Sequence, residues 1–194
     1  MSASHKRIIL AGIAGGMAMN ITMLLTFRLL GFGWNGGGIL LEASSQSEKL
    51  IAVWTKLEPL PLVVNTPAPI IIGIILFGIF HAYLFNWISP VLPKGIFNAG
   101  IKFGLMLFVM VFLFWEFFTP FNMFDEPLHL IALELAFWAC IAIADGLAIS
   151  FLLRNKACIS ALGDRPRLIG INSAVISTTL NELVNIPRYR PSPV

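Results

Sequence analysis

Charged residues are scarce in this chain of 194 residues: Asp, Glu, Lys and Arg make up 12% of it, whereas hydrophobic residues make up 57%. Soluble domains carry about 25% charged residues, because their surfaces face water. A soluble fold of this length could not bury so much apolar surface. The composition therefore excludes an ordinary soluble protein and predicts that lipid surrounds much of the chain.

Motifs of several enzyme and binding classes are also missing. The two cysteines, Cys140 inside an apolar run and Cys158 just after it, lack the spacing of a zinc site, and we expect no disulfide. The glycine-rich segment 31–38 lacks the Gly-Lys-Ser/Thr ending of a phosphate-binding loop. No Ser stands in a Gly-x-Ser-x-Gly context, and the 13 Lys and Arg residues form no basic run. We therefore expect no cofactor and no nucleic-acid partner.

What the chain has instead is long apolar runs. A helix needs about 20 residues to cross about 30 Å of hydrocarbon, because each residue adds about 1.5 Å. The sequence predicts an all-α integral membrane bundle of four transmembrane helices in residues 1–157, followed by a basic, partly disordered tail in residues 158–194. The predicted spans cover residues 8–30, 69–89, 96–119 and 127–153.

A short amphipathic helix is predicted between the first and second spans. Ser45 and Glu48 have the spacing of a capping box, in which each side chain bonds the other residue's backbone N–H. Leu50, Val53 and Trp54 then recur at helical spacing. Such a helix lies on the membrane surface or covers one end of the bundle.

The basic residues are distributed unevenly between the two sides that four crossings create. Ten of the Lys and Arg residues fall on the side of the termini and three on the other, which holds Arg28, Lys49 and Lys56. The positive-inside rule then places both termini in the cytoplasm. We expect a multi-pass protein of a bacterial inner membrane or plasma membrane, with the connection between the first two spans outside.

Small residues at spacing four predict close helix packing, because they let helix backbones approach in lipid. Gly100 and Gly104 form one such pair. The fourth span carries a longer stripe, consisting of Ala132, Ala136, Cys140, Ala144 and Ala148. Besides the bilayer, a second copy of the chain or a larger membrane complex is the expected partner.

Polar side chains inside the spans are the main functional signal. Ionisable residues in a span are unfavourable by about 2.5 to 3.5 kcal/mol on insertion scales, and they usually face a bundle interior. Their positions stagger them in depth, which suits a relay for protons or a small cation. The alternative is that the acids sit at interfaces near helix ends and the amide bonds a neighbouring helix. The path candidates are Glu116, Glu134, Asp145, His81 and Asn20.

A metal site is a second hypothesis, centred on the turn between the third and fourth spans. Glu126 and His129 have the Glu-x-x-His spacing of carboxylate metal sites, and Glu116 could reach them from the adjacent helix. The spacing occurs once, whereas di-iron bundles use it twice. The alternative is that the acids favour the positive end of a helix and that His129 lies at the interface.

Three classes of function thus stay open. The first is a non-enzymatic accessory or assembly component that binds a membrane partner or lipid, and the sequence favours it. The second is a small proton or cation conductor that uses the staggered polar residues. The third is a membrane metal-binding enzyme at Glu116, Glu126 and His129.

Overall fold

A computed structural model describes residues 3–155, and its regular structure there is entirely helical. Four helices are long and apolar enough to cross a membrane, which confirms the predicted fold class and supports a multi-pass membrane protein. The tail predicted for residues 158–194 lies outside the described residues. Membrane sidedness stays a prediction. The four spans are His5–Gly31, Ala68–Ile88, Ile96–Phe124 and Leu128–Arg154.

The second and fourth spans are each a single α-helix, the first continues from α-helix into π-helix, and the third alternates between the two. The first consists of α1 (His5–Met23) and the π-helical η1 (Leu24–Gly31), the second is α4 (Ala68–Ile88) and the fourth is α8 (Leu128–Arg154). The third alternates between α- and π-helix: α5 (Ile96–Leu107), η3 (Phe108–Phe112), α6 (Leu113–Glu116), η4 (Phe117–Phe121) and α7 (Asn122–Phe124). The connection between the first two spans holds η2 (Ile39–Leu41), α2 (Glu48–Thr55) and α3 (Leu62–Asn65).

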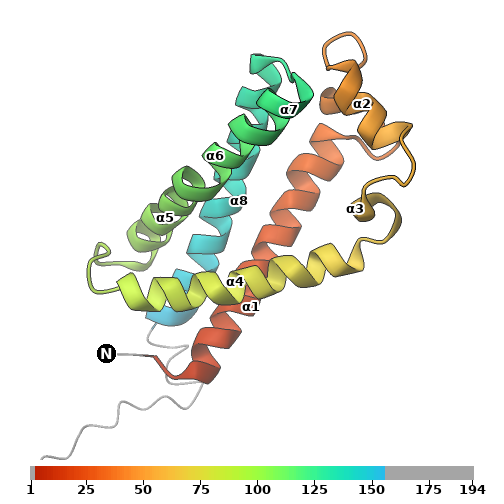
Figure 1. The fold of residues 1–194 in the computed structure, drawn as a ribbon. Coiled ribbons are helices and arrows are strands. Elements are labelled where there is room, and N and C mark those ends of the chain that lie inside the picture. Colours follow the sequence, from red (N-terminus) through yellow and green to blue (C-terminus); the bar gives the residue numbers. More distant parts are fainter. Residues whose placement is uncertain (1–2, 156–194) are drawn as a thin grey trace, which may run out of the picture. The chain divides into compact units, whose positions relative to one another are not determined.

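Helices α1 and α8 lie at the centre of the bundle. They pack on each other, α4 crosses α1 obliquely and also contacts α8, and α5 packs on α8 (Figure 1). Helices α1 and α4 approach each other closely where they cross, since both have glycine there. A Cβ added to Gly78 would lie only 2.5 Å from the carbonyl oxygen of Gly12 and from the nitrogen of Gly16. At this point, backbone touches backbone.

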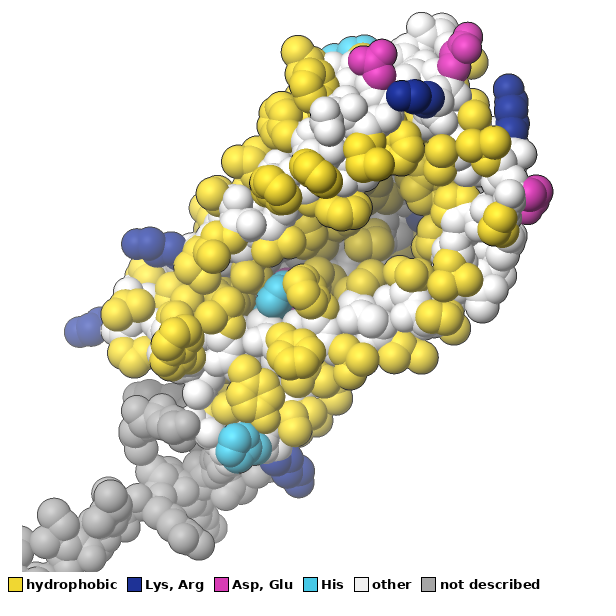
Figure 2. All heavy atoms as spheres, in the orientation of Figure 1, with side chains coloured by type: hydrophobic (Ala, Val, Ile, Leu, Met, Phe, Trp, Pro, Cys, Tyr) yellow, Lys and Arg dark blue, Asp and Glu magenta, His cyan; other side chains and the backbone are white. Residues whose placement is uncertain are grey.

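The surface of the spans is apolar. Large hydrophobic side chains are exposed along the first three spans and near both ends of the fourth, and Figure 2 shows hydrophobic side chains over most of the visible face. This surface suits a lipid environment. The small-residue stripe of the fourth span also faces outward, since Ala132, Ala136 and Cys140 are exposed. The other two members, Ala144 and Ala148, are half-buried.

The third span continues past its predicted end at Thr119. Proline lacks the N–H that helix continuation needs, so Pro120 predicts a stop. The structure instead includes Pro120 in η4 and ends the span at Phe124, where Asp125 adopts a left-handed conformation with φ 56°. The turn to α8 is therefore shorter than predicted.

The predicted amphipathic helix exists as α2, but its cap is Ser47. The Ser47 hydroxyl accepts from the backbone N–H of Leu50 at 3.1 Å and donates to the carbonyl of Phe124 at 2.6 Å. The predicted cap, Ser45, bonds the carbonyl of Glu42 instead. One hydroxyl thus starts α2 and fastens it to the turn between α7 and α8.

Candidate functional site

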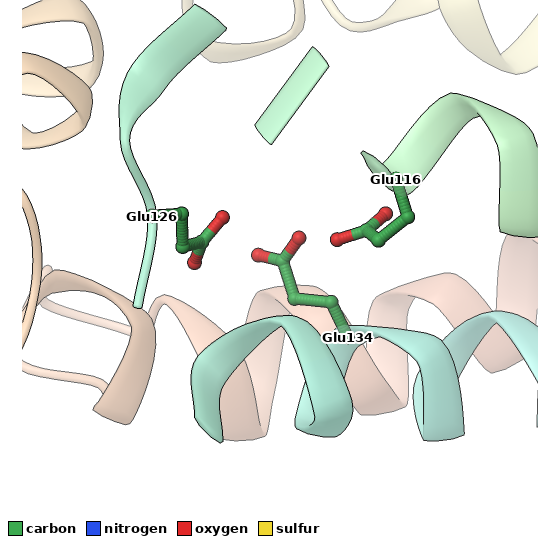
Figure 3. A group of neighbouring side chains, drawn as sticks. All are labelled: Glu116, Glu126 and Glu134. Carbon is green, nitrogen blue, oxygen red and sulfur yellow. The ribbon is translucent and has the colours of Figure 1, made fainter. Parts of the chain in front are cut away.

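Three glutamates meet at the end of the bundle that α2 covers. Glu116 comes from α6, Glu126 from the turn before α8, and Glu134 from α8. Each offers a carboxylate oxygen that lies within 4.8 Å of the others' oxygens, and Figure 3 shows the three side chains pointing toward one another. Their exposed fractions are 0%, 1% and 7%. We call this group the Glu triad.

The π-helical segment η3 brings Glu116 to the interior. The buried face of α5 runs through Phe103 and Leu107, and the next buried residues are Phe112 and Glu116, so a step of five interrupts the spacing of three or four. In an uninterrupted α-helix, Glu116 would lie about 180° from Leu107, since nine residues make about two and a half turns. A π-helical insertion shifts the residues that follow it around the axis. The π-helical segment η3 therefore turns the Glu116 carboxylate inward, whereas a regular α-helix would turn it outward.

Glu126 reaches the interior because it precedes the helix. Helix α8 begins at Leu128, Pro127 occupies the cap position, and no side chain bonds the first turn as a cap. Glu126 therefore lies one residue before the cap position of α8. The left-handed turn at Asp125 reverses the chain, and the Glu126 side chain is buried.

Two N–H donors hold the outer members of the Glu triad. Trp138 Nε1 donates to Glu116 Oε2 at 2.8 Å, and Gln46 Nε2 donates to Glu126 Oε1 at 2.7 Å. The Gln46 amide also bonds the carbonyl of Leu40 and accepts from the N–H of Ser47, so both of its ends are fixed. The connection between the first two spans therefore supplies part of the site.

Within residues 3–155, the remaining oxygens of the outer glutamates receive no N–H or hydroxyl donor, and the carboxyl groups of Glu116 and Glu134 are close enough to share a proton. Glu116 Oε1 and Glu126 Oε2 are buried without a hydrogen bond. Buried polar atoms are nearly always paired, and an unpaired one destabilises a protein by about 1 to 3 kcal/mol. Glu126 lies between the spans; burial raises its pKa above the usual range, the Gln46 hydrogen bond opposes this rise and the charge of Glu116 adds to it.

A polar hollow lies next to the Glu triad, between α2 and the turn before α8. Its volume is about 390 Å³, and Gln46 lines it together with Asp125 and Pro127, the neighbours of Glu126. Serine hydroxyls and the charged residues Glu48 and Lys49 complete its wall. The hollow therefore lies beside Glu126, and Gln46 both lines it and bonds that carboxylate.

We expect Gln46→Ala to loosen this wall. The variant loses the bonds to Glu126 and to Leu40, and hydrogen bonds to charged groups contribute about 1.5 to 3 kcal/mol each. Trypsin should then cut after Lys49 and Lys56 several-fold faster than in the wild type, as mass spectrometry of the fragments would show. Ser44→Ala, at an exposed position of the same segment, is the control. Equal cleavage of all three proteins would contradict a fastening role for Gln46.

A second polar contact lies further along α8. His81 Nδ1 of α4 is 2.6 Å from Asp145 Oδ2 of α8, and both residues are buried. Asp145 Oδ1 is buried without a hydrogen bond. It lies beside Gly15 of α1, where a Cβ would come within 2.3 Å of it.

The structure thus divides the predicted path residues into separate groups. Glu116 and Glu134 belong to the Glu triad, and His81 pairs with Asp145. Between Glu134 and Asp145, the buried face of α8 carries the apolar residues Phe137, Ile141 and Ala142. Asn20 stands apart from both groups and donates to the carbonyl oxygens of Gly16 and Ile71, which links α1 to α4.

The predicted metal ligands come together only in part. Glu116 and Glu126 meet, but His129 is exposed and Glu134 occupies the third position. The Glu-x-x-His spacing places two residues on one face only when both are helical, and Glu126 is not. Gln46 and Trp138 were not among the predicted site residues, because an amide in a loop and an indole in an apolar run carry no motif.

No family model, curated protein or solved structure matches this chain. Its function therefore has to be argued from the geometry of the two buried groups.

Proposed function

We propose that this multi-pass membrane protein binds a divalent metal cation at the Glu triad. The observation that carries the proposal is the convergence of three buried carboxylates with unpartnered oxygens on Glu116 and Glu126. Like charges at this spacing repel one another in a dry site, and a cation between them removes the repulsion and supplies the missing partner.

The donor set favours a hard cation. All three candidate ligands are carboxylates, and oxygen-only sites suit Mg²⁺, Ca²⁺ and Mn²⁺, whereas sites for softer metals use His and Cys. The three residues come from two helices and one turn, so they would fill part of the coordination shell and leave the remainder to water. Trp138 and Gln46 would act as supporting donors that orient Glu116 and Glu126.

Of the three classes that the sequence leaves open, metal binding is the one that the Glu triad favours. Glu134 takes the place predicted for His129. The conductor is less favoured, because apolar residues separate the two buried groups on α8. An accessory role in a membrane complex is compatible with a bound cation and stays a prediction.

Manganese binding tests the proposal directly. The purified protein in detergent would be stripped with a chelator and titrated with Mn²⁺, and free Mn²⁺ would be followed by its electron paramagnetic resonance signal. We expect a single ion per chain. Glu126→Gln and Glu134→Gln should each weaken binding by more than about 100-fold, since loss of a mere supporting group already weakens metal affinity by about 10- to 100-fold.

The matched control is Asp125→Asn. Asp125 is the exposed acid next to Glu126, and Asn tolerates its left-handed backbone. This variant should bind Mn²⁺ as the wild type does. Absence of stoichiometric binding to the wild type, or equal weakening by Asp125→Asn, would refute the proposal.

A further inference from the structure

The second buried polar group suggests a different ligand. His81 and Asp145 face each other from α4 and α8, inside two membrane spans, and lie eleven residues along α8 from Glu134. At about 1.5 Å per residue this separates the pair from the Glu triad by about 16 Å along the helix. The pair therefore does not share a cation with the triad.

The surroundings of the pair are buried and include two aromatic rings. The His81 ring lies 4.4 Å from the Phe77 ring and 6.5 Å from the Phe103 ring, measured between centroids. Asp145 is fully buried, and Gly15 leaves the space that its Oδ1 occupies. Only one carboxylate and one imidazole are offered here, too few ligands for a metal ion.

Within residues 3–155, His81 is the titratable group that contacts Asp145. On the elements packed around the pair, the remaining titratable groups are near the span ends, exposed, or in the Glu triad. Arg7 of α1 donates to the carbonyls of Leu152 and Leu153, and Arg154 of α8 donates to those of Ser89 and Pro93. The other groups are His5, Lys6 and Arg28 on the first span, Tyr83 on α4, Lys102 on α5, and Glu134, His129 and Cys140 on α8.

We propose that His81 and Asp145 form an intramembrane proton-binding site. A structural pair would satisfy both carboxylate oxygens, but Asp145 Oδ1 is buried without a partner. A charged carboxylate in that position is unfavourable unless a proton is held within the pair. The hydrogen-bond distance of 2.6 Å between Nδ1 and Oδ2 lets that proton lie on either atom.

The imidazole is the route by which the proton exchanges. The His81 side chain is 6% exposed, whereas that of Asp145 is 0% exposed. A proton taken up at Nε2 makes the ring cationic, and the proton on Nδ1 then passes to Asp145 Oδ2, which leaves a neutral ring and a neutral acid. The reverse steps release one proton, so charge and atoms balance.

Nitrogen-15 magnetic resonance of histidine tests this site without altering it. The chain has 3 histidines, and His5 and His129 are exposed, so His5→Gln and His129→Gln assign the two other signals and leave that of His81. We expect the His81 nitrogen shifts to change across a pH titration, because proton uptake moves the ring proton from Nδ1 to Nε2. Asp145→Asn should move the midpoint by about one pH unit or more.

Two results would overturn the proposal. A pair that only holds α4 against α8 keeps a single tautomer, so constant His81 shifts over the whole range would refute proton binding. An unchanged midpoint in Asp145→Asn would exclude Asp145 as the partner. Neither readout depends on Mn²⁺, so this test and the test of the Glu triad can fail separately.

Discussion

Gly78→Leu should unfold the bundle at the crossing of α1 and α4. Even a Cβ at this position would lie 2.5 Å from Gly12 O and from Gly16 N, and 2.8 Å from Gly16 Cα. These are backbone atoms, which cannot rotate away as a flexible side chain could, so the helices must separate. Overpacking a buried site usually destabilises a protein by about 1 to 3 kcal/mol, and the backbone contact places this variant at or above that upper limit.

The measurement is thermal unfolding in detergent, followed by circular dichroism. A loss of about 3 kcal/mol lowers the Tm of a chain of this size by about 10 °C. Gly73→Leu is the matched control, because Gly73 lies one turn and a half earlier on α4 and a Cβ there meets nothing within 4 Å. If both variants melted together, α4 would not pack on α1 at Gly78.

The four helical spans could be predicted from the length of the apolar runs. Apolar runs of 20 residues or more have one physical solution in lipid, the helix, because every backbone polar group must be bonded within the segment. The spans at residues 69–89 and 127–153 were therefore predicted to within one residue at each end. Small residues at spacing four do not say which helices approach each other closely.

The candidate site was harder to predict, since it depends on breaks in regular structure. Glu116 turns inward because η3 contributes a step of five residues, and Glu126 is buried because α8 begins two residues later. Hydrophobic periodicity assumes a regular helix and detects neither. His81 and Asp145 were expected at different depths, but the structure places His81 Nδ1 2.6 Å from Asp145 Oδ2.

The Glu triad should lower the stability of the protein when no cation is bound. Without a cation, three buried carboxylates lie close together and two of their oxygens have no partner. Glu116→Gln keeps the shape of the side chain and an oxygen for Trp138, but it removes one charge and adds N–H donors that the neighbouring carboxylates can accept from. In excess chelator we therefore expect the variant to melt at a higher temperature than the wild type.

Added Mn²⁺ should reverse that order. A ligand at 100 times its Kd stabilises the native state by about 2.7 kcal/mol, which the wild type gains and the variant largely loses. Thermal unfolding of both proteins, with chelator and with Mn²⁺, measures the reversal, and Glu48→Gln, at an exposed acid in α2, should behave as the wild type in both conditions. If Glu116→Gln were less stable even in chelator, the carboxyl groups would serve as hydrogen-bonding partners of the fold. A structural cluster would keep the same order of stability with and without Mn²⁺, so the reversal separates a cation site from a structural cluster.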